Sequence, residues 1–129
     1  MPGEKILVVE DNPLNMELTA DILGAAGYVV LQAENAERGI TLARAEKPAL
    51  ILMDVRLPGM DGLLATEILK REAETQEIPV VALTAHAMKG DEDKALAAGC
   101  QGYITKPIDT RSLPGDVAGF LRSAESGEP

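Results

Sequence analysis

Short apolar runs alternate with longer segments of helical periodicity along the chain. The runs at residues 6–9, 50–53 and 80–83 contain no polar alternation, which is typical of parallel strands buried on both faces. Weaker apolar runs at 28–31 and 103–105 predict strands nearer the edges of the sheet. The pattern therefore predicts five strands, three of them central.

Helices are predicted between these strands from their end signals and apolar stripes. Asn12, Asn35 and Asp61 are N-cap residues that predict the starts of the first three helices. A fourth helix is predicted at 89–98, ahead of a glycine, and a fifth at about 113–122, where a Pro-Gly pair interrupts the first turn.

This repeated β-α alternation predicts an α/β fold, a doubly wound parallel sheet with helices on both faces and right-handed crossovers. We assign residues 1–123 to one domain and residues 124–129 to a polar C-terminal tail. At 129 residues and 46% hydrophobic composition, the chain suits one globular domain.

Composition and charge exclude several functions. A net charge of −9 disfavours direct nucleic-acid and anionic-membrane partners, and an aromatic content of 2% provides no platform for stacking bases. The single cysteine, Cys100, rules out an internal disulfide. No apolar run approaches the roughly 18 residues of a membrane span, and we expect a cytoplasmic protein.

The candidate chemistry lies in the polar residues that end the predicted strands. The first strand ends in Glu10 and Asp11, the third in Asp54, the fourth in Thr84, and the fifth in Lys106. Ligands of open parallel sheets bind beyond the carboxyl ends of the strands. Three carboxylates meeting at one edge repel one another, and Mg²⁺, which prefers oxygen ligands, relieves that repulsion.

Taken singly, each of these residues has an ordinary structural explanation. Acids at strand ends are usually solvated turn formers, Thr84 suits a strand, and a Lys-Pro pair suits a turn. The placement of all these residues at the same sheet edge is stronger evidence for a site than any one of them alone. Asp54 is the hardest to explain structurally, because a carboxylate directly after a buried strand pays a desolvation cost of several kcal/mol unless it is compensated.

Four segments together resemble the receiver domains of two-component and phosphorelay response regulators. They are Val-Val-Glu-Asp-Asn at 8–12, Met-Asp-Val-Arg-Leu-Pro-Gly-Met-Asp-Gly at 53–62, Leu-Thr-Ala at 83–85 and Tyr-Ile-Thr-Lys-Pro at 103–107. The resemblance covers about residues 5–121. It implies a flavodoxin-like, five-stranded sheet of order 2-1-3-4-5 with five helices.

The resemblance also implies roles for the acidic residues. Asp54 would be the phosphoacceptor, taking a phosphoryl group from a phosphohistidine of a histidine kinase or a histidine phosphotransfer protein. Asp11, Asp54 and the backbone carbonyl of Arg56 would bind Mg²⁺ directly, and Glu10 would act through water. Lys106 would pair with Asp54 and later with a phosphate oxygen.

A switch follows from the same resemblance. Thr84 would move toward the phosphoryl group and Tyr103 would rotate inward behind it, shifting the populations of two surface arrangements. Tyr103 is otherwise an ordinary edge-strand aromatic residue. The output surface implied for a downstream protein lies near Met88, Tyr103 and Ile108.

Two further positions vary in the family, and both carry large polar side chains here. Arg56 and His86 would tune the lifetime of the acyl phosphate by shielding or orienting the hydrolytic water; His86 is equally well explained as a surface-loop residue. Residues 10–18 resemble receivers of phosphorelays and hybrid kinases, and residues 98–103 fit single-domain cell-cycle-type regulators.

Two other classes of protein share parts of this pattern, and in each case the sequence lacks a feature that the chemistry needs. A metal-dependent aspartyl phosphatase would need a second acid where Arg56 stands, and a flavin-binding electron carrier would need a Ser/Thr-rich phosphate loop after the first strand. A receiver fragment of a hybrid histidine kinase and a degenerate receiver used only for docking share the same motifs. We expect a signalling domain that catalyses its own phosphorylation and dephosphorylation, and not an enzyme in the ordinary sense.

Overall fold

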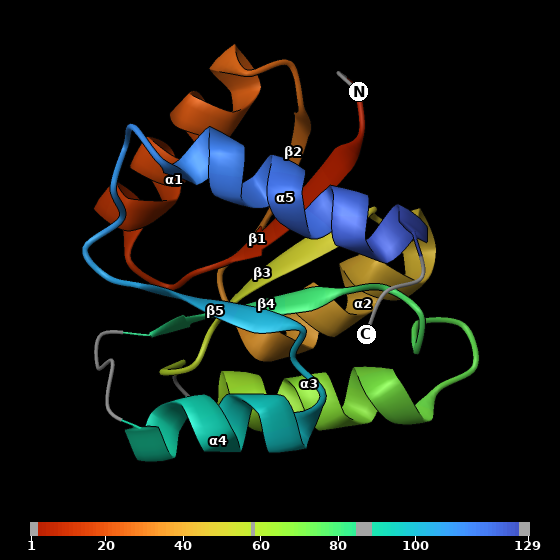
Figure 1. The fold of residues 1–129 in the computed structure, drawn as a ribbon. Coiled ribbons are helices and arrows are strands. Elements are labelled where there is room, and N and C mark those ends of the chain that lie inside the picture. Colours follow the sequence, from red (N-terminus) through yellow and green to blue (C-terminus); the bar gives the residue numbers. More distant parts are fainter. Residues whose placement is uncertain (1–2, 58, 85–88, 127–129) are drawn as a thin grey trace.

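A computed structural model describes residues 3–57, 59–84 and 89–126. Five parallel strands form one sheet in the order β2-β1-β3-β4-β5 (Figure 1). The strands are β1 (Lys5–Val9), β2 (Val29–Ala33), β3 (Leu50–Asp54), β4 (Val80–Thr84) and β5 (Gly102–Thr105). The flavodoxin-like α/β fold expected from the sequence is confirmed, with the two weaker apolar runs forming the edge strands.

Five helices connect the strands and cover both faces of the sheet. They are α1 (Pro13–Ala25), α2 (Ala36–Glu46), α3 (Gly62–Arg71), α4 (Lys89–Ala98) and α5 (Leu113–Ser126). Helices α1 and α5 lie on one face, and α2, α3 and α4 lie on the other (Figure 1). A doubly wound sheet of this kind leaves the carboxyl ends of its strands open for a site.

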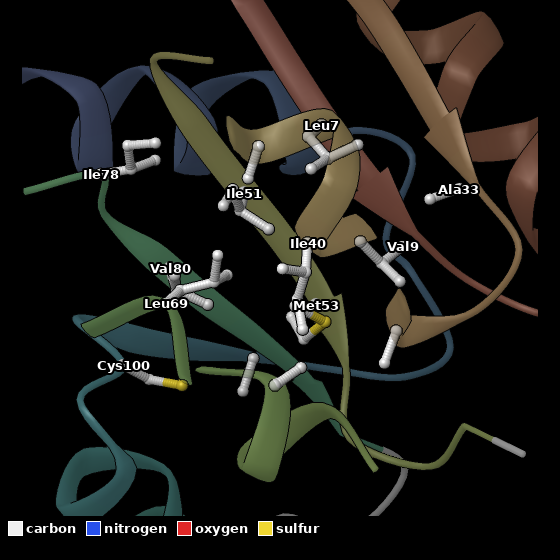
Figure 2. Close-up of a cluster of buried hydrophobic side chains, with 14 of the residues drawn as sticks. Leu7, Val9, Ala33, Ile40, Ile51, Met53, Leu69, Ile78, Val80 and Cys100 are labelled. Atoms are coloured by element: carbon white, nitrogen blue, oxygen red, sulfur yellow. The ribbon is translucent and has the colours of Figure 1, made fainter. Parts of the chain in front are cut away.

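Each face of the sheet has its own apolar core. On the α2–α4 side, Leu7, Ile51 and Met53 of the central strands pack against Ile40 of α2 and Leu69 of α3 (Figure 2). The opposite core contains alternate residues of the same strands packed on α1 and α5. All five residues of β3 and of β4 are buried, because side chains of both parities face a helix layer.

The predicted N-caps are confirmed. The Oδ1 atom of Asn12 accepts hydrogen bonds from two backbone amides in the first turn of α1, at 2.9 and 3.1 Å. Asn35 and Asp61 each accept one from the first turn of α2 and α3, at 2.8 Å in both cases. These caps fix where the helices begin, directly after the loops that hold the polar residues.

The ends of some elements differ from the sequence-based expectation. Strand β2 begins one residue later than expected, and α5 continues to Ser126 instead of ending near Arg122. Ala124 and Glu125 favour helix, and no proline or glycine interrupts the chain until Gly127. Pro114 stands in the first turn of α5, a position that tolerates proline. The Lys106–Pro107 peptide bond is cis.

Candidate functional site

The parallel register brings the carboxyl ends of β1 and β3 together. Val9 of β1 is opposite Met53 of β3, so the residues that follow them, Glu10 and Asp54, are neighbours at the sheet edge. Both carboxylates are buried, with 3% and 4% of each residue exposed, and Asp11 is exposed beside them. Adjacent strand ends thus place three acids at one point.

Lys106, just after β5, is the cation of this cluster. Its Nζ lies 2.7 Å from Oε1 of Glu10 and 2.8 Å from Oδ2 of Asp54, and its side chain is largely buried. Two backbone amides add support: that of Asn12 donates to Oε2 of Glu10 at 3.3 Å, and that of Arg56 donates to Oδ1 of Asp54 at 3.0 Å. Both buried carboxylates are therefore fixed in orientation.

The crowding of charge shifts two pKa values. Burial, followed by hydrogen bonding with Asp54, raises the pKa of Glu10 to about 7, although Lys106 opposes the shift. Burial lowers the pKa of Lys106, but its hydrogen bonds to Asp54 and Glu10 and their charges outweigh that effect, so the pKa stands above its ordinary value. The ammonium is thus held charged, while Glu10 gains a proton far more readily than an exposed glutamate.

The same three acids form a donor set for a metal ion. One carboxylate oxygen from each of Glu10, Asp11 and Asp54 lies within 4.8 Å of the other two. They line an open cleft of about 410 Å³, together with Asn12, Pro13, Asn15, Arg56 and Lys106. A set of hard oxygen donors beside an open space suits a divalent cation that keeps some of its waters.

Thr84 and Tyr103 lie next to this cleft and not in its lining. Both border a second, small cavity of about 50 Å³ on the α3–α4 side of the sheet, and Arg56 borders both spaces. Tyr103 and Ile108 also line a surface groove of about 570 Å³ between β5 and α5. His86 and Met88, the other residues singled out from the sequence, lie outside the described residues.

The sequence reasoning missed one residue that the site requires. Gly62, the first residue of α3, is buried against Asp54, and a Cβ atom there would lie 2.0 Å from the backbone carbonyl oxygen of Asp54. Helix α3 can therefore begin beside the acidic cleft only with glycine at this position. Gly62 is part of a motif quoted above, but its contact depends on how α3 packs against β3.

Comparison with known proteins agrees with this arrangement. The family model described as "Response regulator receiver domain" matches residues 6–118, and the chain belongs to that family. Receiver domains are the phosphoacceptor domains of two-component signalling, and they interact with histidine kinases or phosphotransfer proteins and with downstream effectors. They are signalling domains and not enzymes of the ordinary kind.

Two relatives of known kind are similar to the chain over nearly its whole length. The chain is 42% identical to the polar-differentiation response regulator DivK of Brucella anthropi, over 94% of this chain and 98% of DivK. A Pseudomonas aeruginosa structure, the receiver domain of sensor histidine kinase PA1611 with magnesium coordinated in its active-site cleft, is 34% identical. It aligns with a TM-score of 0.86 over 94% of this chain and 99% of that one.

The fold is also shared with a less similar protein. Vibrio cholerae chemotaxis response regulator CheY4 aligns with a TM-score of 0.87 over 92% of this chain and 98% of that one, at 22% identity.

Within the described residues, no helix has the length and apolar content that crossing a membrane demands.

Proposed function

We propose that Asp54 accepts a phosphoryl group from a phosphohistidine of a histidine kinase or a histidine phosphotransfer protein. The observation that carries this proposal is the shared ammonium: Lys106 contacts Asp54 at 2.8 Å and Glu10 at 2.7 Å, in a cleft where three carboxylates converge. Such a site holds a carboxylate nucleophile in place and sets a positive charge beside it.

In the proposed step, a carboxylate oxygen of Asp54 forms a bond to phosphorus as the bond between phosphorus and the donor's imidazole nitrogen breaks. The electron pair returns to the imidazole. Lys106 then pairs with a phosphoryl oxygen, and the backbone amide of Arg56, 3.0 Å from Oδ1, keeps the carboxylate oriented.

We propose Mg²⁺ as the cation of the cleft. Asp11, Asp54 and the backbone carbonyl of Arg56 would hold it directly, and Glu10 would act through water. When bound, Mg²⁺ supplies positive charge to the phosphoryl oxygens. The magnesium ion coordinated in the active-site cleft of the PA1611 receiver supports this choice of ion by similarity.

The remaining roles belong to the same proposal. Thr84 and Tyr103 would form the switch, supported by their position on one cavity beside the cleft. A downstream protein would bind near Tyr103 and Ile108, which line one groove, and near Met88. Arg56 and His86 would tune the lifetime of the acyl phosphate.

We further propose that the receiver domain comprises residues 1–123 and acts in the cytoplasm without binding nucleic acid or membrane directly. The net charge of −9 supports the absence of direct nucleic-acid and anionic-membrane binding. Residues 124–129 would be a C-terminal segment, the first three of which continue α5.

The test is incubation with acetyl phosphate and Mg²⁺, followed by intact-mass measurement. The mass should rise by one phosphoryl group, Asp54→Asn should abolish the rise, and chelation of Mg²⁺ should suppress it. Asp21→Asn, at an exposed position of α1, is the matched control and should be phosphorylated like the parent. Equal phosphorylation of the Asp54→Asn variant, or none of the parent, would overturn the proposal.

The partner is tested separately. The chain should take a phosphoryl group from a subset of purified, phosphorylated histidine kinases or phosphotransfer proteins, and transfer should require Asp54. Phosphorylation by acetyl phosphate with no transfer from any of them would leave the chemistry standing and refute the protein donor.

A further inference from the structure

The small cavity beside the acidic cleft has two small residues, both alanines, in its lining. Ala82 of β4 and Ala95 of α4 are both buried and both border the space of about 50 Å³. Ala82 is directly opposite Tyr103 in the β4–β5 register. Tyr103, which packs against the core on this face of the sheet, therefore also borders unfilled volume.

Two cations also border this cavity. Arg56 follows β3 and Lys94 lies on α4, and neither has an ion-pair partner among the residues that the structure describes. Arg56 borders the acidic cleft as well, whereas Lys94 borders a surface groove between α3 and α4 on its other side. Like charges around one small space repel, and no carboxylate among the described residues lines the cavity to offset them.

We propose that Lys94 is a positioning residue that couples the phosphoryl charge on Asp54 to the position of Tyr103. The inference rests on the proposed function of Asp54 and extends it. Phosphorylation makes the acidic cleft more negative by about one charge. Arg56, which borders both spaces, is attracted toward the cleft, and Lys94 then remains as the cation in the lining of the cavity that Tyr103 also borders.

An ammonium is attracted to the face of a tyrosine ring, so Lys94 favours the arrangement in which Tyr103 occupies the cavity. Lys94 acts through Tyr103 and does not line the cleft that holds Asp54. Loss of its charge should therefore weaken the response of Tyr103 while leaving occupancy of the cleft unchanged. A purely structural role for Lys94 would not change the position of Tyr103 while leaving occupancy of the acidic cleft the same, so this pair of measurements distinguishes the two.

The experiment uses the full chain labelled with fluorotyrosine in a Tyr28→Phe background, so that Tyr103 is the only labelled residue. Fluorine NMR spectra are recorded without and with beryllofluoride and Mg²⁺. Fluorine bound to beryllium reports occupancy of the cleft in the same spectrum in which the tyrosine signal reports the position of Tyr103.

At saturating beryllofluoride, Lys94→Met should lower the ratio of inward to outward Tyr103 about two- to fivefold, the size expected for a partly exposed cation–ring interaction. Lys94→Arg should restore the ratio to within twofold of the parent. Lys47→Met, at an exposed lysine bordering neither space, is the matched control and should behave like the parent. Lys94→Gln provides a second neutral variant should Lys94→Met fold poorly.

An unchanged tyrosine ratio in a folded, fully occupied Lys94→Met or Lys94→Gln variant would overturn the inference and leave the proposed function intact. Absence of a bound-beryllofluoride signal in the parent, together with no phosphorylation by acetyl phosphate, would overturn both. The inference would also be refuted if Lys94→Met or Lys94→Gln lowered beryllofluoride binding in the cleft in proportion to the fall in the Tyr103 ratio. Lys94 would then act on the cleft itself.

Discussion

Titration of Glu10 should make the metal-free protein less stable as the pH rises. The folded-state pKa of Glu10 is about 7, against an ordinary value of 4.5, because burial and Asp54 disfavour its charged form. The folded state therefore binds a proton that the unfolded state releases between these two values. The stabilisation is fully present below about pH 4.5 and is lost as the pH rises through 7.

The size of the effect follows from the difference in pKa. The difference between 4.5 and about 7 is multiplied by about 1.4 kcal/mol per pKa unit, so the loss attributable to Glu10 is at most about 3.5 kcal/mol. Much of it should fall between about pH 5 and pH 7.5, where an exposed glutamate is already ionised in both states. Lys106 does not titrate in this range, because its raised pKa lies above 10.5.

The assay is urea unfolding at intervals from about pH 5 to pH 8 with chelator present, for the parent and for Glu10→Gln. Subtraction of the variant's free energy of unfolding cancels the other titrating groups. The free energy of unfolding of the parent, minus that of Glu10→Gln, should fall by about 2 to 3 kcal/mol from the lowest pH to the highest. Glu34→Gln, at an exposed acid on the same edge, should give a flat difference. A flat difference for Glu10→Gln as well, or one that favours the parent at high pH, would refute the electrostatic interpretation of the cleft.

Three further outcomes are expected. Asp54→Asn should stabilise the metal-free protein by about 1 kcal/mol at about pH 8, because it leaves Glu10 and Lys106 as a one-to-one pair; a less stable variant in urea unfolding would contradict this. Gly62→Ala should destabilise the fold by about 2 kcal/mol or more and slow phosphorylation by acetyl phosphate, since its Cβ meets a backbone oxygen at 2.0 Å. Gly24→Ala, with open space around it on α1, is its control and should stabilise by about 0.5 to 1 kcal/mol in the same unfolding assay. Mg²⁺ at about a hundredfold excess over its dissociation constant should stabilise the protein by about 2.7 kcal/mol, seen as a higher Tm, with a smaller rise in Asp54→Asn.

The pattern of the sequence predicted the α/β fold class and the gathering of polar residues at one sheet edge for one physical reason, whereas the order of the strands came from the resemblance to receiver domains. Buried parallel strands appear as continuous apolar runs, and their carboxyl ends lie at one edge, so the polar residue after each run is placed by topology alone. Glu10, Asp54 and Lys106 follow from this rule, and the structure brings all three into contact. N-caps such as Asn12 are equally local signals.

Features that depend on packing between distant elements could not be predicted in this way. The close approach of Gly62 to Asp54 depends on how α3 lies against β3, and the cavity beside Tyr103 depends on two small residues from β4 and α4. No local pattern marks Lys94, which lines that cavity together with its buried neighbour on α4, Ala95. The sequence pattern predicts which residues lie at the edge of the sheet, but the cavities between helices and strands depend on their packing in three dimensions.

The electrostatic balance of the cleft explains why phosphoryl transfer here should require a divalent cation. At an effective dielectric constant of about 20, each of the two Lys106 contacts contributes an attraction of about 6 kcal/mol, and each carboxylate pair within 4.8 Å opposes it by about 3 kcal/mol or more. Three such repulsions, with the desolvation of two buried carboxylates, nearly cancel what one ammonium supplies. Phosphorylation adds about one further negative charge at Asp54 and leaves Lys106 as the only cation in contact with that residue among those described. The balance then turns unfavourable unless positive charge enters, and the cation must be at least divalent to offset both the new charge and the existing surplus.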